Sequence, residues 1–314
     1  MCIVDEGASP LFSPHKPDEV SATAALLEVV RRDPHLLGIE RNRWDLANLL
    51  QCCDWLRLQS LAGLWRLLDR LGISYKRGRP YVHSPDPHYL AKQKELEQIK
   101  QLVASEPERL VLLYLDEVTL YRQPTLASNY EAKGHIQPKA PRSYQSDYTL
   151  TRIIASLNGA SGQVEYLRAT KIGLEALVGF YQQIRAAYPH AERIYVVEDN
   201  WPVHFHPNVL VALEPQESHW PKRLMSNWPS EPSEAAQKHW GALHLPIQLV
   251  QLPTYASWLN PIEKLWRKLN QEMVHLHRLA DKVMEFRHSL DHFLDKFAAG
   301  SRELLRYVGL GVPN

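Results

Sequence analysis

The apolar run Arg-Leu-Val-Leu-Leu-Tyr-Leu at residues 109–115 constrains the fold of this chain more than any other feature. A strand that is apolar along its length is typical of the centre of a sheet covered on both faces. Residues 193–197 and 247–252 form two similar runs, and helical patterns occupy residues 173–188 and 261–275. This alternation predicts an α/β fold in which a mixed sheet is flanked by helices.

Two further features belong to the same region. Residues 148–157 and 163–169 resemble strands on either side of Asn158-Gly159, a pair that favours a hairpin turn. Residues 214–246 break the pattern, because they contain several prolines and three tryptophans and are too long for an ordinary loop. We expect an insertion there, whose tryptophans form either a small core or a protein-binding face.

The N-terminal part contains three short helical patterns, at residues 24–32, 44–53 and 60–71. Ser60 is a good N-cap and Gly72 a good C-cap for the third pattern, and a basic extended arm follows at residues 73–82. The arrangement fits a helix-turn-helix whose third helix enters the major groove of DNA. A small helical bundle with a solvated basic face is the alternative.

These patterns divide the chain into four parts. We expect a helix-turn-helix domain with a basic arm at residues 1–83, a linker and exposed helix at 84–106, an α/β domain at 107–275 that contains the insertion at 214–246, and a helical tail at 276–314. In the first part, base contacts are expected from the start of the third helix and phosphate contacts from the arm. The candidate DNA-binding residues there are Gln59, Ser60, Arg66, Lys76, Arg77 and Arg79.

The overall composition indicates the compartment of the protein and the kind of surface that could bind DNA. The formal net charge is +1, so any DNA-binding surface has to come from local patches. The sequence has no apolar run long enough to span a membrane and no secretion signal at Met1–Pro10. Its 3 cysteines lack metal-site spacing, which indicates reduced thiols and a cytoplasmic protein.

Three acids stand at positions where ligands commonly bind. Asp116 directly follows the first apolar run, Asp199 follows the run at 193–197, and Glu263 falls in the first turn of the helix at 261–275. Ligands bind at strand ends of open α/β sheets, and buried charge is costly without a partner. An all-oxygen set suits Mg²⁺ or Mn²⁺, and two such ions can promote phosphodiester cleavage.

Each acid also has a structural alternative. Because side chains alternate along a strand, only one member of Asp116-Glu117 and one of Glu198-Asp199 can face a common site. Glu263 falls at the third helical position if Asn260 is the N-cap, where a capping-box glutamate belongs.

Three motifs carry a resemblance to a known family. They are Leu115-Asp116-Glu117 with Pro124, Tyr130 and Gly134; Val197-Glu198-Asp199-Asn200-Trp201-Pro202-Val203-His204; and residues 252–266, Leu-Pro-Thr-Tyr-Ala-Ser-Trp-Leu-Asn-Pro-Ile-Glu-Lys-Leu-Trp. They resemble the catalytic blocks of bacterial insertion-sequence transposases of the mariner superfamily, which are of the DDE type.

The resemblance implies a ribonuclease H-like catalytic domain that cleaves transposon ends and joins the freed 3′-hydroxyl to target DNA. It implies that Asp116, Asp199 and Glu263 are catalytic and hold the metal ions, and that the protein is a nucleoid-associated homodimer. The interval between Asp199 and Glu263 is longer than usual for the family, and the insertion accounts for the excess.

Only one helix-turn-helix is visible, whereas the family usually carries two. A truncated or domesticated copy that binds DNA without completing transposition is therefore the alternative function, and a standalone structure-selective nuclease is a third.

Other polar residues near the motifs are candidates for supporting roles. Asn200, His204 and Asn260 could orient an acid or touch the scissile phosphate, although a plain surface role is the alternative for His204. Lys264 and Lys268 follow Glu263 on its helix and could hold DNA phosphates, or they could simply be solvated.

Overall fold

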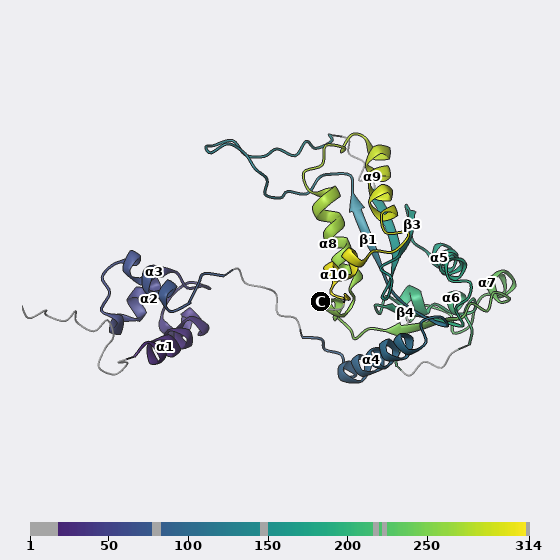
Figure 1. The fold of residues 1–314 in the computed structure, drawn as a ribbon, viewed down its shortest axis with the longest axis horizontal. Helices are drawn as coiled ribbons and strands as arrows, with labels where there is room; N and C mark the ends of the chain where they lie inside the picture. The colour runs from purple at the N-terminus through teal and green to yellow at the C-terminus, as the bar shows by residue number, and fades with distance from the viewer. Residues whose placement is uncertain (1–17, 77–82, 145–149, 216–219, 222–224, 312–314) are drawn as a thin grey trace, which may run out of the picture. The chain divides into compact units, whose positions relative to one another are not determined.

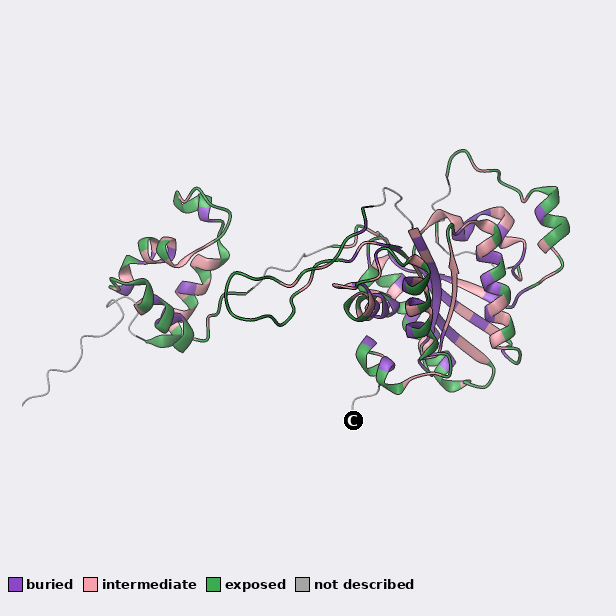
Figure 2. Cartoon of the chain, turned by 90° about the horizontal axis from the view of Figure 1, so that it is seen from above, coloured by how far each residue is buried: buried purple, intermediate pink, exposed green. Residues whose placement is uncertain are grey.

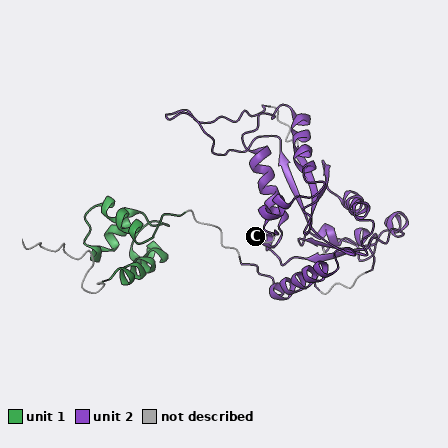
Figure 3. Cartoon of the chain, viewed as in Figure 1, with its two compact units in different colours: residues 1–81 green, residues 82–314 purple. Residues whose placement is uncertain are grey.

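The computed structural model describes residues 18–76, 83–144, 150–215, 220–221 and 225–311. The chain divides into two compact units, Met1–Tyr81 and Val82–Asn314 (Figure 3). None of the helices in the described ranges is long and apolar enough to cross a membrane.

The first unit is a small helical fold around one core. Its helices are α1 (Glu19–Arg31), η1 (Pro34–Leu37), α2 (Leu46–Cys52), η2 (Asp54–Leu56) and α3 (Leu61–Arg70). Asp18 and Asp45 accept hydrogen bonds from backbone amides of the first turns of α1 and α2, so α1 starts earlier and α2 later than predicted. Ser60 caps α3 as expected. Leucines from all three α-helices form the core.

The second unit is built on a five-stranded mixed sheet of order β3-β2-β1-β4-β5. The strands are β1 (Leu110–Tyr121), β2 (Leu150–Asn158), β3 (Val164–Ala169), β4 (Arg193–Glu198) and β5 (Ile247–Gln251). β4 and β5 run parallel to β1, whereas β2 pairs antiparallel to it. The predicted mixed sheet is confirmed.

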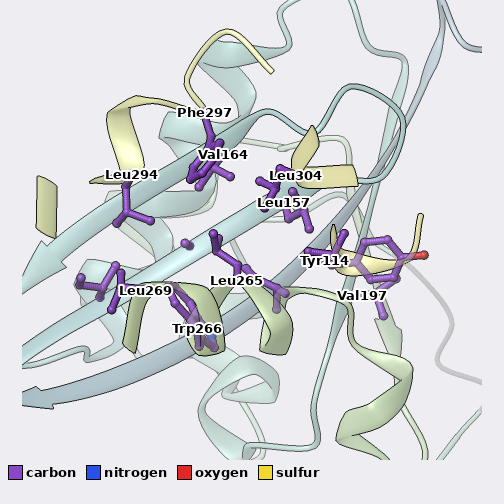
Figure 4. Close-up of a cluster of buried hydrophobic side chains, with 14 of the residues drawn as sticks. Tyr114, Leu157, Val164, Val197, Leu265, Trp266, Leu269, Leu294, Phe297 and Leu304 are labelled. Atoms are coloured by element: carbon purple, nitrogen blue, oxygen red, sulfur yellow. The ribbon is translucent and has the colours of Figure 1, made fainter. Parts of the chain in front are cut away.

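Helices cover both faces of this sheet (Figures 1 and 2). One face packs against α4 (Tyr89–Ser105), α8 (Ile262–Leu269), α9 (Val283–Asp295) and α10 (Arg302–Val308), as Figure 4 shows for the side chains around Leu265 and Leu294. The other packs mainly against α5 (Leu174–Ala187) and α6 (Pro207–Leu210). Alternate residues of β1 enter the two cores, Leu112 and Tyr114 on the α8 face and Leu113 and Leu115 on the α5 face.

β1 is longer than the apolar run predicted, so Asp116 lies within the strand rather than after it. The parallel pairing with β4 stops at Tyr114, but the antiparallel pairing with β2 continues to Tyr121. The strand is extended by its partner β2 and not by its own apolarity. Beyond Tyr114 one edge of β1 is therefore no longer paired with β4.

The predicted hairpin of β2 and β3 around Asn158-Gly159 is confirmed, because the two strands pair antiparallel. β2 ends at Asn158 and β3 begins at Val164, and Asn158 Oδ1 accepts hydrogen bonds from the Ala160 and Ser161 amides. Gly162 has φ +71°, and a Cβ there would lie 2.4 Å from the Ser301 carbonyl oxygen. Glycine is required at this position because both the conformation and the space exclude a side chain.

Two other expectations about the helices and the insertion were wrong. α4 is not an exposed helix, because Lys92, Leu96, Ile99 and Val103 are buried along one side. The three tryptophans of the insertion do not form a small core of their own: Trp220 packs on His88, Trp228 on His206, and Trp240 joins the core on the α5 face. The described part of the insertion contains α7 (Glu234–Trp240).

The segments that flank the motifs complete the fold. A short 3-10 turn, η3 (Pro202–Phe205), follows the end of β4, and another, η4 (Ser257–Leu259), precedes α8. α8 does not continue as an α-helix to His275, because it changes into one π-helical turn, η5 (Asn270–Val274).

Candidate active site

The structure brings the three predicted acids to one cavity of about 620 Å³ at the carboxyl ends of β4 and β5. Asp116, Asp199 and Glu263 all line it, together with Asn200, Asn260 and the loop that precedes α8. Each acid comes from a different element, as predicted from strand ends and a facing helix. Three segments that lie far apart in the sequence therefore contribute to a single site.

Asp116 points to the α8 face of the sheet. Its Oδ2 accepts a 2.9 Å hydrogen bond from Trp266 Nε1, one turn after Glu263 on α8. Burial, together with the negative charge of Glu263 and more weakly of Asp199, raises the pKa of Asp116 to about 7, although the Trp266 hydrogen bond opposes the shift. The Asp116 carboxyl is thus poised to change charge near neutral pH.

Glu263 lies in the first turn of α8 and is exposed to solvent. Partial burial of the Glu263 carboxyl group and the negative charge of Asp199 raise the pKa of Glu263. The capping-box alternative for Glu263 is wrong, because no side chain caps α8 and its N-cap is Pro261. Its carboxylate is consequently free of a capping role.

Asn260 completes the edge of β1 that β4 leaves unpaired. Its Nδ2 donates a 2.9 Å hydrogen bond to the carbonyl oxygen of Leu115, the residue before Asp116. Asn260 is buried, and its Oδ1 has no hydrogen-bond partner among the described residues. A buried amide oxygen without a partner is costly, so this oxygen is available to a ligand in the cavity.

Asp199 follows β4 as predicted, in a tight local turn. Its Oδ1 accepts a 2.8 Å hydrogen bond from the Trp201 amide, and burial raises its pKa. The neighbouring Asn200 uses its Nδ2 to donate a 2.7 Å hydrogen bond to the Leu252 carbonyl oxygen. Asn200 therefore ties the end of β4 to the end of β5.

The other acids of the two pairs, Glu117 and Glu198, point to the α5 face of the sheet. Glu198 Oε2 accepts a 3.0 Å hydrogen bond from the Tyr181 hydroxyl, and both side chains are fully buried. His204 Nδ1 lies 3.0 Å from the same oxygen, although the ring N–H is not aligned with it, and His204 Nε2 lies 3.6 Å from Glu117 Oε1. The alternation thus directs Asp116 and Glu198 to opposite faces, whereas Glu117 also lines part of the cavity.

Burial favours the neutral forms of Glu117, Glu198 and His204. Burial raises the pKa values of Glu117 and Glu198 well above the usual range, and burial lowers the pKa of His204 to about 3. The surface role considered for His204 is wrong, because this side chain is fully buried. Tyr181, Glu117 and Glu198 were not predicted as members of a polar cluster, although two consecutive acids at a strand end were a signal for it.

The predicted DNA-contact residues lie outside the cavity. Lys264 Nζ donates to the Val308 carbonyl oxygen at 2.8 Å, and Lys268 pairs with Glu272. In the first unit, Gln59, Arg66 and Lys76 are exposed, and the Ser60 hydroxyl accepts from the Gly63 amide as an N-cap; Arg77 and Arg79 lie outside the described residues. α3 also exposes Leu61 and Trp65, which the sequence reasoning did not single out.

The donor set of the cavity fits a hard divalent cation. Carboxylate and amide oxygens are the ligands of Mg²⁺ and Mn²⁺, and the unpartnered Asn260 Oδ1 adds to them. Across the described ranges, no three His, Cys, Asp or Glu side chains stand close enough to form a ready-made metal site. Mg²⁺ usually keeps several waters and binds through one or two carboxylates plus a substrate phosphate, so such a cage is not needed.

Comparisons with known proteins agree with this geometry. The sequence model of a family described as DDE superfamily endonuclease matches residues 111–287. The chain is 20% identical over 272 residues to the "Insertion element IS630 uncharacterized 39 kDa protein" of Shigella sonnei, covering 86% of this chain and 69% of that protein.

Solved structures give the same fold. The chain is similar to the Mos1 mariner paired end complex with Mn, with a TM-score of 0.57 and 14% identity over 98% of this chain and 78% of that one. It is also similar to the Mos1 transposase paired-end complex with left transposon end, with a TM-score of 0.57 and 15% identity over the same shares. The predicted fold class, a ribonuclease H-like sheet after a helical N-terminal part, is confirmed.

Proposed function

The chain belongs to the DDE superfamily endonucleases, the DDE-type transposase family that its three acidic motifs predicted, and from this membership we propose that it transposes an insertion element. It would cleave the ends of the element and join the freed 3′-hydroxyl to target DNA. One observation carries the proposal: Asp116, Asp199 and Glu263 reach the same open cavity from β1, the end of β4 and the start of α8.

We propose that these three carboxylates hold two Mg²⁺ or Mn²⁺ ions. When bound, the ions would supply activation of the attacking oxygen and stabilisation of the leaving oxygen at the phosphodiester. The chain's own contribution is alignment. Trp266 fixes the rotamer of Asp116 through its 2.9 Å hydrogen bond, and the rigid β1 and α8 set the separation of Asp116 from Glu263.

Three uncharged side chains would support the acids. Asn260 holds the Leu115 carbonyl next to Asp116, and Asn200 holds the strand end that carries Asp199. His204 lies 3.8 Å from Asp199 Oδ1 and forms the buried wall behind it. We assign these residues mainly to positioning, because the hydrogen bonds and contacts named here are made to the protein itself, while Asn260 Oδ1 stays open to the cavity.

DNA recognition would come from the first unit and its arm. We propose that Gln59, Ser60 and Arg66 on or beside α3 reach the bases, and that the arm residues Lys76, Arg77 and Arg79 contact phosphates. Gln59 and Arg66 are exposed, as this role requires. Two element ends must be held together during transposition, so we propose that the protein acts as a homodimer on nucleoid DNA in the bacterial cytoplasm.

The test is a cleavage assay with a labelled DNA fragment that carries the inverted repeats flanking the gene, in Mg²⁺ or Mn²⁺. Asp199→Asn and Glu263→Gln should abolish cleavage while DNA binding is kept. Glu285→Gln is the matched control, because Glu285 is an exposed α9 residue that pairs with Lys282. Metal-dependent cutting at the repeat boundary supports the proposal. Equal cutting by the Asp199 variant would refute the assigned site, and binding without cutting by the wild type would indicate a truncated DNA-binding copy.

A further inference from the structure

A deeply buried ion pair lies outside the acidic cavity, between Lys92 and Asp86. Lys92 Nζ lies 2.9 Å from Asp86 Oδ2, and both side chains are only 4% exposed. Asp86 precedes α4 and Lys92 lies in its first turn. A buried ion pair is weak support for stability as such, because desolvation offsets the attraction, so its contacts deserve a functional explanation.

The contacts of this pair lead to the wall of the cavity. Asp86 Oδ2 accepts a 3.0 Å hydrogen bond from the Thr254 amide, and Lys92 Nζ donates to the Leu252 carbonyl oxygen at 3.4 Å. Ser84 Oγ donates to the Thr254 carbonyl oxygen at 2.6 Å. We call residues 252–259, which join β5 to Asn260, the pocket loop.

The pocket loop has little regular structure of its own. Only the short η4 turn, Ser257–Leu259, lies within it, and Tyr255 adopts φ +55°. Seven of its residues, Leu252 to Trp258, line the cavity. The loop's own backbone bonds are confined to short turns, and bonds from outside hold it at two places: β4 and Asn200 hold Leu252, and Ser84, Asp86 and Lys92 hold Leu252 and Thr254.

Asp86 is organised for this task. Its Oδ1 accepts a 2.8 Å hydrogen bond from the His88 amide, which fixes the carboxylate at the start of α4. Burial alone would raise the pKa of Asp86, but the Thr254 amide and Lys92 outweigh burial and lower the pKa to about 2. The anchor therefore stays charged across the physiological pH range.

The pocket loop leads directly to two groups of the site. Its last residue is followed by Asn260, which bonds to the carbonyl beside Asp116, and then by Glu263 in the first turn of α8. We propose that Asp86 and Lys92 are positioning residues, which hold the pocket loop so that Asn260 and Glu263 are aligned with Asp116 and Asp199. This inference rests on the proposed function of the acids.

The experiment compares variants of the full chain. Asp86→Asn breaks the charge pair, and the double variant Asp86→Asn with Lys92→Met replaces it by neutral groups of similar size. Ser84→Ala removes the hydrogen bond to the Thr254 carbonyl oxygen and the weaker one that the hydroxyl accepts from the Asp86 amide. Asp291→Asn is the control, because its ion pair with Arg168 is also partly buried but lies between α9 and β3, away from the cavity. Each protein is first shown to keep its thermal unfolding transition.

Three measurements follow: Mn²⁺ binding by electron paramagnetic resonance, hydrogen exchange of the backbone amides of residues 254–260, and cleavage at saturating DNA. Loss of an outer partner of a metal-binding group typically costs about 10- to 100-fold in metal affinity or activity, and we expect a loss in this range for the double variant. Ser84→Ala should show a smaller loss, and both should show faster exchange in the pocket loop. Asp291→Asn should behave like the wild type.

The outcomes separate the two proposals. If the wild type binds Mn²⁺ and cleaves but the Asp86 and Lys92 variants match Asp291→Asn in all three measurements, the positioning role is refuted and the proposed function stands. If the variants lose cleavage while Mn²⁺ affinity and loop exchange stay unchanged, the positioning role is also refuted. If the wild type neither binds Mn²⁺ nor cleaves, the proposed function fails and the positioning role falls with it.

Discussion

Replacing Asp116 by asparagine should stabilise the metal-free protein while it destroys the site. Burial and the charges of Glu263 and Asp199 raise the pKa of Asp116 from 3.8 to about 7. For a carboxyl group whose pKa is raised on folding, the stabilising contribution is complete below the unfolded value and is lost as the pH rises through the folded value. The wild type therefore loses stability from this group between about pH 4 and pH 7.

The size of the effect follows from the shift. The change from 3.8 to about 7 corresponds to about 4 kcal/mol, since each unit of pKa is worth about 1.4 kcal/mol. Asparagine keeps an oxygen that can accept from Trp266 Nε1, so the hydrogen bond is retained. We expect Asp116→Asn to raise the free energy of unfolding by about 2–4 kcal/mol at pH 8 and to have almost no effect at pH 4.

The assay is urea unfolding of both proteins in a chelator from pH 4 to pH 8, followed by tryptophan fluorescence and circular dichroism. Glu285→Gln serves as the control, because an exposed pair such as Lys282–Glu285 contributes only about 0–1 kcal/mol. Added Mn²⁺ should then stabilise the wild type and not the Asp116 variant. A stability difference that is independent of pH, or a variant less stable than the wild type at pH 8, would refute the argument.

Three further substitutions test neighbouring contacts. Asn260→Ala leaves the Leu115 carbonyl oxygen without its donor and should cost about 1–3 kcal/mol in urea unfolding; an unchanged midpoint would contradict the bonding role. Trp266→Phe removes the hydrogen bond that opposes the pKa shift of Asp116, so the pH at which stability is lost should move upward, and a downward move would be incompatible with this reasoning. Gly162→Ala forces a Cβ against a backbone carbonyl at positive φ and should cost about 1–3 kcal/mol or more in thermal or urea unfolding, so a neutral result would count against the backbone geometry.

The strands of the sheet could be predicted because they are apolar along their length. Residues 193–197 and 247–252 were placed to within a residue of β4 and β5. The end of β1 was missed, because residues 116–121 include polar side chains and are held in the strand by pairing with β2. Pairing between distant segments is not visible in local apolarity, so a strand that outlasts its apolar run is underestimated.

The acids could be predicted for a different reason. The parallel pairing of β1 with β4 ends at Tyr114 and Val197, so Asp116 and Asp199 both lie two residues beyond it, and the helix of Glu263 faces the same edge. The environment of His204 could not be predicted, because it depends on Tyr181 from α5 and on Glu117 from β1. The same limit applies to the tryptophans of the insertion, whose partners His88 and His206 lie elsewhere in the sequence.

The two faces of the sheet place their acids in different surroundings, although Glu117 also lines part of the cavity. Glu117 and Glu198 lie beside the buried Tyr181 and His204, where burial favours neutral carboxyl groups and a neutral imidazole. A protonated carboxyl group must lose its proton before it can hold a cation, so Glu198, which does not line the cavity, is the less suitable acid of its pair.

Asp116, Asp199 and Glu263 instead meet at an open cavity, where burial raises all three pKa values and neighbouring negative charges add to the shifts of Asp116 and Glu263. A divalent cation relieves that mutual repulsion and lowers the pKa values of the carboxyl groups that it contacts. The burial and repulsion of these carboxylates lower the stability of the metal-free protein as the pH rises, and the same repulsion would favour the binding of a cation. Asp116→Asn should therefore increase stability and abolish activity together.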